Sequence, residues 1–434
     1  MLWRSGKVDL RTYYRYLHNG ASDVAIVSIF FLGYLGPELL SVGSQLWLSE
    51  WSSVSIEEQQ AESQILYYQG VYALLSMGAM VVLLCRAWIW AGVVVKAAQN
   101  IHEQLLASIL RLPISFFDKT PTGRILNRFS SDIDQIDALL SQSLSGQCEF
   151  TVRALTAVAV CVYVVPPVGL ALVPVFATYI YYGNLFRASS REIRRLDATT
   201  RSPVYAHFGE TLAGLSTIRS FGDADRFTLK NKQLLEGNLM TRWSDALTQR
   251  WLNFRFDQVS ALLIGVSLLA AVYLRASLTG GLVGMLLVQL FSSVRSFRMT
   301  LKGFVNLEAQ MTYAERVFEF IDEEQEPPRV LPSDPSAASS WPSGGAIAIK
   351  SASLRYRKGL PLALDEISLE IRPKERVGIC GRTGSGKSTL TLALFRIVEL
   401  AAGSITLDGR NIAELGLQTL RRALTIIPQD PVML

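Results

Sequence analysis

Long apolar runs separated by charged segments are the dominant pattern of this 434-residue chain. Each run is long enough for the roughly 20 residues that a helix needs to cross the hydrocarbon core of a bilayer. The first run begins at Val24 and is too long for the apolar part of a secretory signal peptide. The pattern predicts six membrane-spanning helices, near residues 24–48, 66–95, 139–165, 168–187, 256–274 and 282–302.

The charges between the runs predict how the helices are oriented. Residues 49–65 contain four glutamates and no lysine or arginine, whereas residues 187–250 carry many arginines. Loops rich in lysine and arginine favour the cytoplasmic side of a membrane. Because six crossings return the chain to its starting side, the N-terminus and the region after the last span are both predicted to be cytoplasmic.

The connections between the runs alternate in length. Residues 166–167 and 277–280 predict short outer turns, whereas residues 96–138 and 188–255 are long, charged and helical in pattern. We therefore expect helices that extend beyond the membrane, which suits the transfer of motion between a soluble domain and the spans. Residues 327–345 are rich in Pro, Ser and Gly and predict a linker, and short strands are expected after it.

Composition favours a membrane protein over an ordinary soluble enzyme. Hydrophobic residues make up 50% of the chain and charged residues only 18%. The net charge of +5 lies mainly in loops between the apolar runs, without a nucleic-acid-binding motif, so we expect no nucleic-acid partner. The four cysteines have neither paired nor metal-type spacing, so neither disulfides nor a zinc site is predicted.

Residues 381–389 fit the phosphate-binding pattern G-x-x-x-x-G-K-[ST]. In such loops the backbone N–H groups surround phosphate oxygens, here those of residues 384–388. Lys387 would reach the β- and γ-phosphates, and the Ser388 hydroxyl would ligate Mg²⁺. The motif therefore predicts binding of ATP with Mg²⁺.

The residues on either side of this loop suit the motif. Residues 376–380 predict a buried strand that leads into the loop. Residues 388–395 predict a helix whose N-terminus favours an anion. A strand, a glycine-rich loop and a helix in this order are the structural context that the motif requires.

Three separated segments, residues 113–132, 209–219 and 376–388, together resemble ABC transporters of the C subfamily, the multidrug-resistance-associated type. The resemblance runs from residues 6–9 to the last residue. The phosphate loop is most similar to that of the second nucleotide-binding domain of full-length members, so the chain resembles a second half. The resemblance implies an α-helical polytopic membrane domain of exporter type with six transmembrane helices, followed by a partial α/β P-loop domain. The implied boundaries are a membrane domain at 1–322, a linker at 323–345 and the N-terminal part of an ATP-binding domain at 346–434.

The resemblance also assigns roles to single residues. Tyr356 lies where the family places an aromatic ring against adenine, and base stacking of this kind is worth about 1–3 kcal/mol. A tyrosine packed inside the domain is the alternative. Gln429 matches the glutamine loop and would contact Mg²⁺ together with Ser388. The implied nucleotide contacts are Tyr356, Gly381, Thr383, Gly384, Ser385, Gly386, Lys387, Ser388 and Thr389.

The chain ends at Leu434, just after the glutamine loop. By the resemblance, the signature sequence, the acidic motif with the catalytic glutamate and the switch histidine would then be absent. Lys387 and Gln429 would contribute to an incomplete catalytic set, and this polypeptide alone is expected not to hydrolyse ATP efficiently. The implied partner is the other transporter half, with its own membrane and nucleotide-binding domains.

Charged residues inside the spans are costly unless they face partners or water, so they mark candidate functional positions. Glu149 and Arg153 are four residues apart and able to pair on one helical face, either to hold helices together or to serve transport. Arg298 belongs to a stripe whose position also suits snorkelling towards the cytoplasm. Trp251 and Arg255 share a face, and an arginine with a tryptophan suits an anionic, amphipathic small molecule. The candidate substrate pathway consists of Trp251, Arg255 and Arg298, and the other charged positions are Glu38, Arg295 and Lys302.

The combined prediction is an ATP-dependent exporter half in a lipid bilayer, in a membrane that the sequence does not identify. The same subfamily includes an ATP-gated anion channel and potassium-channel regulators, so a channel or a channel regulator is the alternative. An inactive truncated product that only binds nucleotide is the third possibility.

Overall fold

The computed structural model describes residues 8–54, 62–276, 278–335, 341–357, 359–382 and 384–427. The chain forms two compact units. The helical unit comprises residues 1–98 and 135–312, and the sheet unit comprises residues 99–134 and 313–434.

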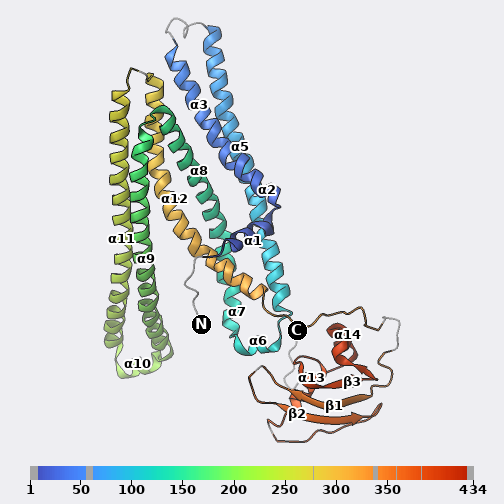
Figure 1. Cartoon of the computed structure of the whole chain (residues 1–434). Coiled ribbons are helices and arrows are strands. Elements are labelled where there is room, and N and C mark those ends of the chain that lie inside the picture. Colours follow the sequence, from blue (N-terminus) through green and yellow to red (C-terminus); the bar gives the residue numbers. More distant parts are fainter. Residues whose placement is uncertain are drawn as a thin grey trace. The chain divides into compact units, whose positions relative to one another are not determined.

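Long helices make up the helical unit (Figure 1). Two of them, α5 and α12, continue into the sheet unit. The elements are α1 (Leu10–Gly20), α2 (Asp23–Ser28), the π-helix η1 (Ile29–Leu35), α3 (Gly36–Ser53), α5 (Glu62–Ile109), the π-helix η3 (Gln135–Leu140), α8 (Ser141–Val164), α9 (Val168–Ala213), α10 (Leu215–Phe221), α11 (Ala224–Tyr273) and α12 (Gly280–Ile321).

The prediction of six spans is confirmed. The described residues contain six helical stretches that are long and apolar enough to cross a membrane. Many of their apolar side chains face outward; in α5, for example, Leu74 is 72% and Trp88 is 85% exposed. Such surfaces are unfavourable in water and suit the hydrocarbon of a bilayer. The chain is therefore an integral, multi-pass membrane protein.

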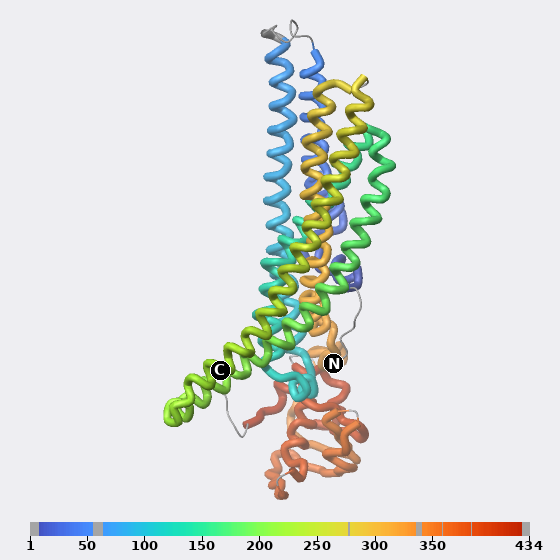
Figure 2. The backbone as a smooth tube through the Cα atoms, turned by 90° about the vertical axis from the view of Figure 1, so that its left-hand side faces the viewer, coloured from blue at the N-terminus to red at the C-terminus, as the bar shows by residue number. Residues whose placement is uncertain are grey.

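Helices α9 and α11 lie side by side and are joined by the short helix α10 (Figures 1 and 2). Phe256 on α11 is only 1% exposed, and its ring centroid lies 4.6 Å from that of Tyr179 on α9. Gly222 ends α10 with a φ of +68°, a left-handed conformation that glycine adopts without steric cost. The helical pattern predicted for residues 188–255 is confirmed.

The sheet unit combines the ends of α5 and α12 with short helices and one small sheet. Its remaining elements are α6 (Ile114–Lys119), α7 (Thr122–Asn127), the π-helix η2 (Arg128–Asp132), β1 (Ile347–Leu354), β2 (Leu364–Ile371), α13 (Lys387–Leu394), β3 (Leu400–Leu407), β4 (Arg410–Asn411), the 3₁₀-helix η4 (Ile412–Glu414) and α14 (Leu417–Ala423).

The four strands are antiparallel and follow the order β2-β1-β3-β4. Ile347 of β1 pairs with Ile371 of β2 on one side and with Leu407 of β3 on the other. Helices α13 and α14 share a hydrophobic core with the sheet, to which they contribute Leu390 and Leu420. This small α/β arrangement agrees with the predicted start of a nucleotide-binding domain.

The prediction of a buried strand at residues 376–380 is wrong. This segment has no strand geometry, and Val377 and Ile379 are 42% and 51% exposed. A buried strand needs neighbouring strands that pair with its backbone and cover its side chains. None of the four strands in the described part of the sheet unit pairs with this segment, so apolar composition alone does not bury it.

Two carboxylates bind the described parts of the Pro- and Ser-rich segment to the sheet unit. Asp334 accepts hydrogen bonds from the Gly416 amide at 2.7 Å and the Thr419 hydroxyl at 2.8 Å. Asp408 accepts from the amides of residues 343–346 at 2.7–3.1 Å. These amide bonds, of which that from Gly344 has the largest effect, lower the pKa of Asp408 to about 2. The segment is thus anchored along much of its described length.

Candidate nucleotide-binding site

The phosphate loop combines a tight turn with two left-handed glycines. The Ser385 amide donates to the Arg382 carbonyl at 3.1 Å, which closes the turn. Gly384 and Gly386 have φ values of +86° and +88°. At Gly386 a Cβ atom would lie 2.9 Å from the Leu364 side chain, so this position has room only for glycine. The backbone at Gly384 and Gly386 therefore favours glycine.

The Lys387 side chain is hydrogen-bonded to the backbone of this loop. Its Nζ donates to the Gly381 carbonyl at 2.8 Å and to the Arg382 carbonyl at 2.8 Å. Lys387 is also the first residue of α13, and no side chain among the described residues caps the N-terminus of this helix. Backbone amides, a helix dipole and an ammonium group therefore converge on the loop, which fits the phosphates of a nucleotide.

The two residues after Lys387 differ in exposure, since Ser388 faces solvent and Thr389 is buried. Ser388 is exposed in the first turn of α13, as a metal-binding hydroxyl requires. Thr389 is only 5% exposed, and its Oγ1 lies 2.7 Å from the Tyr356 hydroxyl. The Tyr356 side chain also packs against the hydrophobic core of the sheet unit. Tyr356 is thus next to the loop, in a position compatible with either of its predicted roles.

Two of the predicted nucleotide and metal contacts, Thr383 and Gln429, lie outside the described residues. Of the two predicted magnesium ligands, the structure therefore places only Ser388. Mg²⁺ usually binds through one or two protein oxygens together with phosphate oxygens and water. A single exposed hydroxyl beside a phosphate loop fits that mode.

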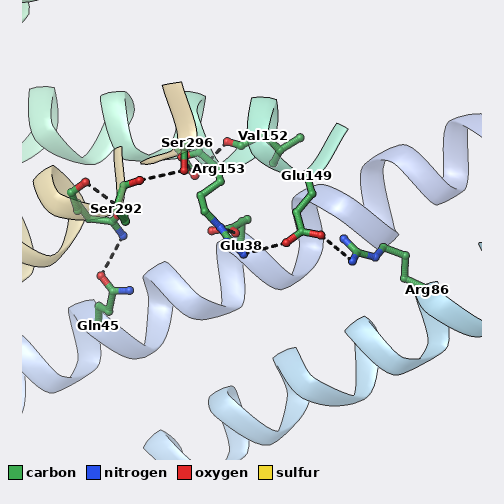
Figure 3. Close-up of polar contacts among 10 residues, drawn as sticks. Glu38, Gln45, Arg86, Glu149, Val152, Arg153, Ser292 and Ser296 are labelled. Atoms are coloured by element: carbon green, nitrogen blue, oxygen red, sulfur yellow. Dashed lines mark hydrogen bonds and ion pairs between the residues drawn. The ribbon is translucent and has the colours of Figure 1, made fainter. Parts of the chain in front are cut away.

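Four of the charged residues within the spans form one ion network (Figure 3). Arg153 on α8 donates to Glu38 on α3 at 2.8 Å and to Glu149, one turn away, at 3.3 Å. Arg86 on α5 bonds to Glu149 at 3.1 Å, and its guanidinium lies 4.6 Å from the ring centroid of Tyr34. The predicted pairing of Glu149 with Arg153 is confirmed, and the network joins three helices. Sequence reasoning missed Arg86, although a charge inside the second apolar run was the available signal.

The candidate substrate-pathway residues lie on α11 and α12. The Arg255 guanidinium is 5.9 Å from the ring centroid of Trp251 and donates to Gln258 at 3.1 Å. Arg298 instead forms an ion pair with Asp257 at 3.1 Å. The structure therefore brings Trp251 and Arg255 together, whereas Arg298 has a carboxylate partner that sequence reasoning did not identify. Asp257 was visible only as a charged residue near the start of the fifth apolar run.

Comparison with known proteins assigns both parts of the chain. Residues 27–297 match the family described as ABC transporter transmembrane region, and residues 364–434 match the family described as ABC transporter. The ATP-binding cassette transporter abc2 of Schizosaccharomyces pombe is 36% identical over 98% of this chain. The ATP-binding cassette sub-family C member 3 of Rattus norvegicus is 35% identical over 99% of it. The metal resistance protein YCF1 of Saccharomyces cerevisiae is 36% identical over 98% of it.

The chain spans 28–29% of the length of these relatives. The transmembrane family covers more than half of the chain, and the second family begins at β2 and includes the phosphate loop. The six apolar helices of the described residues agree with the match to the transmembrane family. The phosphate loop, in which Gly384 and Gly386 have left-handed φ values, agrees with the match to the second family. The chain belongs to the ABC transporter family, and it is similar along almost its whole length to members of the C subfamily.

Proposed function

We propose that this chain is part of an ATP-driven exporter that moves organic anions or other amphipathic molecules across a membrane. The observation that carries this proposal is that the described residues of one chain contain six membrane spans and a phosphate loop at the N-terminus of a helix. Membership of the ABC transporter family implies that the phosphate loop binds ATP. By its similarity to the C subfamily, the other transporter half would supply the signature sequence that faces this phosphate loop.

The phosphate loop would hold the nucleotide through its backbone. Amides of residues 384–388 would donate to phosphate oxygens, for which the Ser385 amide and the Lys387 ammonium would exchange their present carbonyl partners. Mg²⁺, held by Ser388 and Gln429, would neutralise charge that develops on the phosphates. Tyr356 would stack on the base, and this stacking would add affinity for the nucleotide without a contact to the phosphates.

Trp251 and Arg255 are the best candidates for a substrate contact. Arg255 offers a guanidinium with an aromatic face beside it, and this combination suits a carboxylate or sulfonate attached to an apolar body. Arg298 is a weaker candidate because Asp257 already neutralises it.

An ATP-gated channel or channel regulator would retain the same phosphate loop, and its spans would open a pore in place of alternating access.

The nucleotide site is tested by replacing Lys387 with Met in the purified chain in lipid nanodiscs. Loss of a charge-assisted bond costs about 1.5–3 kcal/mol, so the dissociation constant for a fluorescent ATP analogue should rise roughly 10- to 100-fold. Lys350→Met is the control, because Lys350 is exposed on β1. Equal affinity in the two variants would remove the proposed nucleotide site.

Transport is tested with the intact protein in inverted membrane vesicles. ATP-dependent uptake of a conjugated organic anion is expected, and Arg255→Ala should reduce it while Arg275→Ala, at an exposed arginine after α11, leaves it unchanged. ATP-gated single-channel currents without accumulation would establish the channel in place of the exporter. Nucleotide binding without either activity would indicate an inactive product.

A further inference from the structure

Within the sheet unit, the end of α12 is bonded to the corner between α5 and α6. The Ser108 hydroxyl donates to the Phe320 carbonyl at 3.0 Å, and the ring centroids of Phe116 and Phe320 are 5.3 Å apart. Just beyond α12, the Glu326 amide donates to the Arg111 carbonyl at 2.7 Å. Hydrogen bonds and ring packing therefore hold the corner and the segment after α12 together.

A buried carboxylate strengthens this connection. Asp132 is 4% exposed and pairs with Arg128 at 2.6 Å and with Arg316 on α12 at 2.9 Å. The Arg128 guanidinium also lies 5.0 Å from the ring centroid of Phe320. The segment that follows α6 and α7 is thus attached to the same end of α12.

The Glu326 side chain reaches in the other direction, to α14. Its two carboxylate oxygens accept from Arg421 Nη1 at 2.9 Å and Nη2 at 2.8 Å, which is a bidentate pair. Arg421 also donates from Nε to the Phe395 carbonyl and from Nη2 to the Arg396 carbonyl, each at 3.1 Å. The exposed fractions of the Arg421 and Glu326 side chains are 33% and 18%, so solvent screens the pair only in part.

Helix α13 begins at Lys387 of the phosphate loop, and Phe395 directly follows its last residue. A helix of this length is a stiff rod of roughly 12 Å. One end of α13 therefore carries the phosphate loop, and the carbonyl at the other end is bonded to Arg421. A displacement of α13 must change the position of the Arg421 guanidinium or break its bonds.

We propose that Glu326 and Arg421 are positioning residues that transmit displacement of α13 to the α5–α6 corner. The route runs from the phosphate loop through α13 and Arg421 to the Glu326 carboxylate, and from the Glu326 amide to the Arg111 carbonyl. This inference rests on the proposed nucleotide-driven function. It adds a connection that lies within the sheet unit and that does not pass through Gln429.

The first experiment measures hydrogen–deuterium exchange of the full chain in lipid nanodiscs without nucleotide. Arg421→Lys keeps the charge but cannot bond both carboxylate oxygens and the two carbonyls at once. The matched control is Arg422→Lys, because Arg422 is exposed on the same helix. The Glu326 amide is a clean probe, since Pro327 and Pro328 carry no amide hydrogen. Its exchange should rise about tenfold in Arg421→Lys and less than twofold in the control.

The second experiment adds MgATP and follows the exchange of residues 106–120. In the wild-type chain, MgATP should slow exchange at this corner. In Arg421→Lys the dissociation constant should stay within about twofold of wild type, whereas the response at the corner should be lost. A purely structural role would leave the response intact, so this readout separates transmission from stability.

Glu326→Gln, with the exposed neighbour Glu324→Gln as its control, provides an independent pair of variants. It should abolish the response at the corner without changing nucleotide affinity. The proposal is overturned if the Glu326 amide exchanges equally in Arg421→Lys and Arg422→Lys, or if either Glu326→Gln or Arg421→Lys retains the full response. Failure of the wild-type chain to bind MgATP would instead overturn the proposed function, while the exchange experiment without nucleotide would still test the Glu326–Arg421 connection.

Discussion

Removal of the Arg153 cation should destabilise the helical unit measurably. Arg153→Met keeps most of the side chain but deprives Glu38 of its 2.8 Å ion pair and Glu149 of one of two cations. Breaking a fully buried ion pair costs about 3–5 kcal/mol because one charge is left without a partner. Arg153 is 38% and Glu38 only 16% exposed, and Glu149 keeps Arg86, so the expected loss in unfolding free energy is about 1–3 kcal/mol.

A double-mutant cycle distinguishes the ion pair from lost packing. Glu38→Gln alone leaves Arg153 with Glu149, and the double variant Glu38→Gln/Arg153→Met contains no unpaired charge at Glu38. The two substitutions should therefore be non-additive, with a coupling free energy of about 1–2 kcal/mol. The control cycle uses Glu192 and Arg195 on α9, which are 3.0 Å apart but 62% and 69% exposed. Its coupling should be about 0–0.5 kcal/mol.

The assay is denaturant unfolding of the chain in detergent micelles, followed by tryptophan fluorescence with all variants in one buffer. If the Glu38 and Arg153 substitutions add to within about 0.3 kcal/mol, the two side chains do not stabilise the helical unit as a pair. An equally strong coupling in the exposed control pair would also contradict the prediction, because burial would then contribute nothing to the coupling free energy.

Two further substitutions test the sheet unit in the same assay. Gly386→Ala should lower the unfolding free energy by about 1–2 kcal/mol and weaken nucleotide binding, because its φ of +88° strains any L-residue and its Cβ would meet Leu364. Gly378→Ala is the control, since its Cβ would have nothing within 4 Å, and an equal loss there would contradict this reasoning. Asp408→Asn should destabilise the chain at neutral pH. Because the folded pKa of Asp408 is about 2, below the roughly 3.9 of an unfolded aspartate, this stabilisation is present above that value and disappears as the pH falls towards 2. A difference from wild type that persists unchanged down to pH 2 would argue against the carboxylate.

The sequence by itself determined the parts of this protein that depend on contiguous residues. Six apolar runs specify six helices that suit a bilayer, because each run satisfies its own backbone and presents its own apolar surface. The phosphate loop is equally local. Its glycines, Lys387 and Ser388 lie within a few residues of one another, so the spacing alone identifies the loop, in which Gly384 and Gly386 have left-handed φ values.

Only the tertiary structure decided which distant residues meet. Arg86 bonds to Glu149 across 63 positions of sequence, and Glu326 bonds to Arg421 across 95. The apolar segment at residues 376–380 was misread for the same reason, because burial of a strand depends on neighbours that its own composition does not reveal. Side chains far apart in sequence are brought together by the packing of whole elements, and that packing is a property of the fold as a whole.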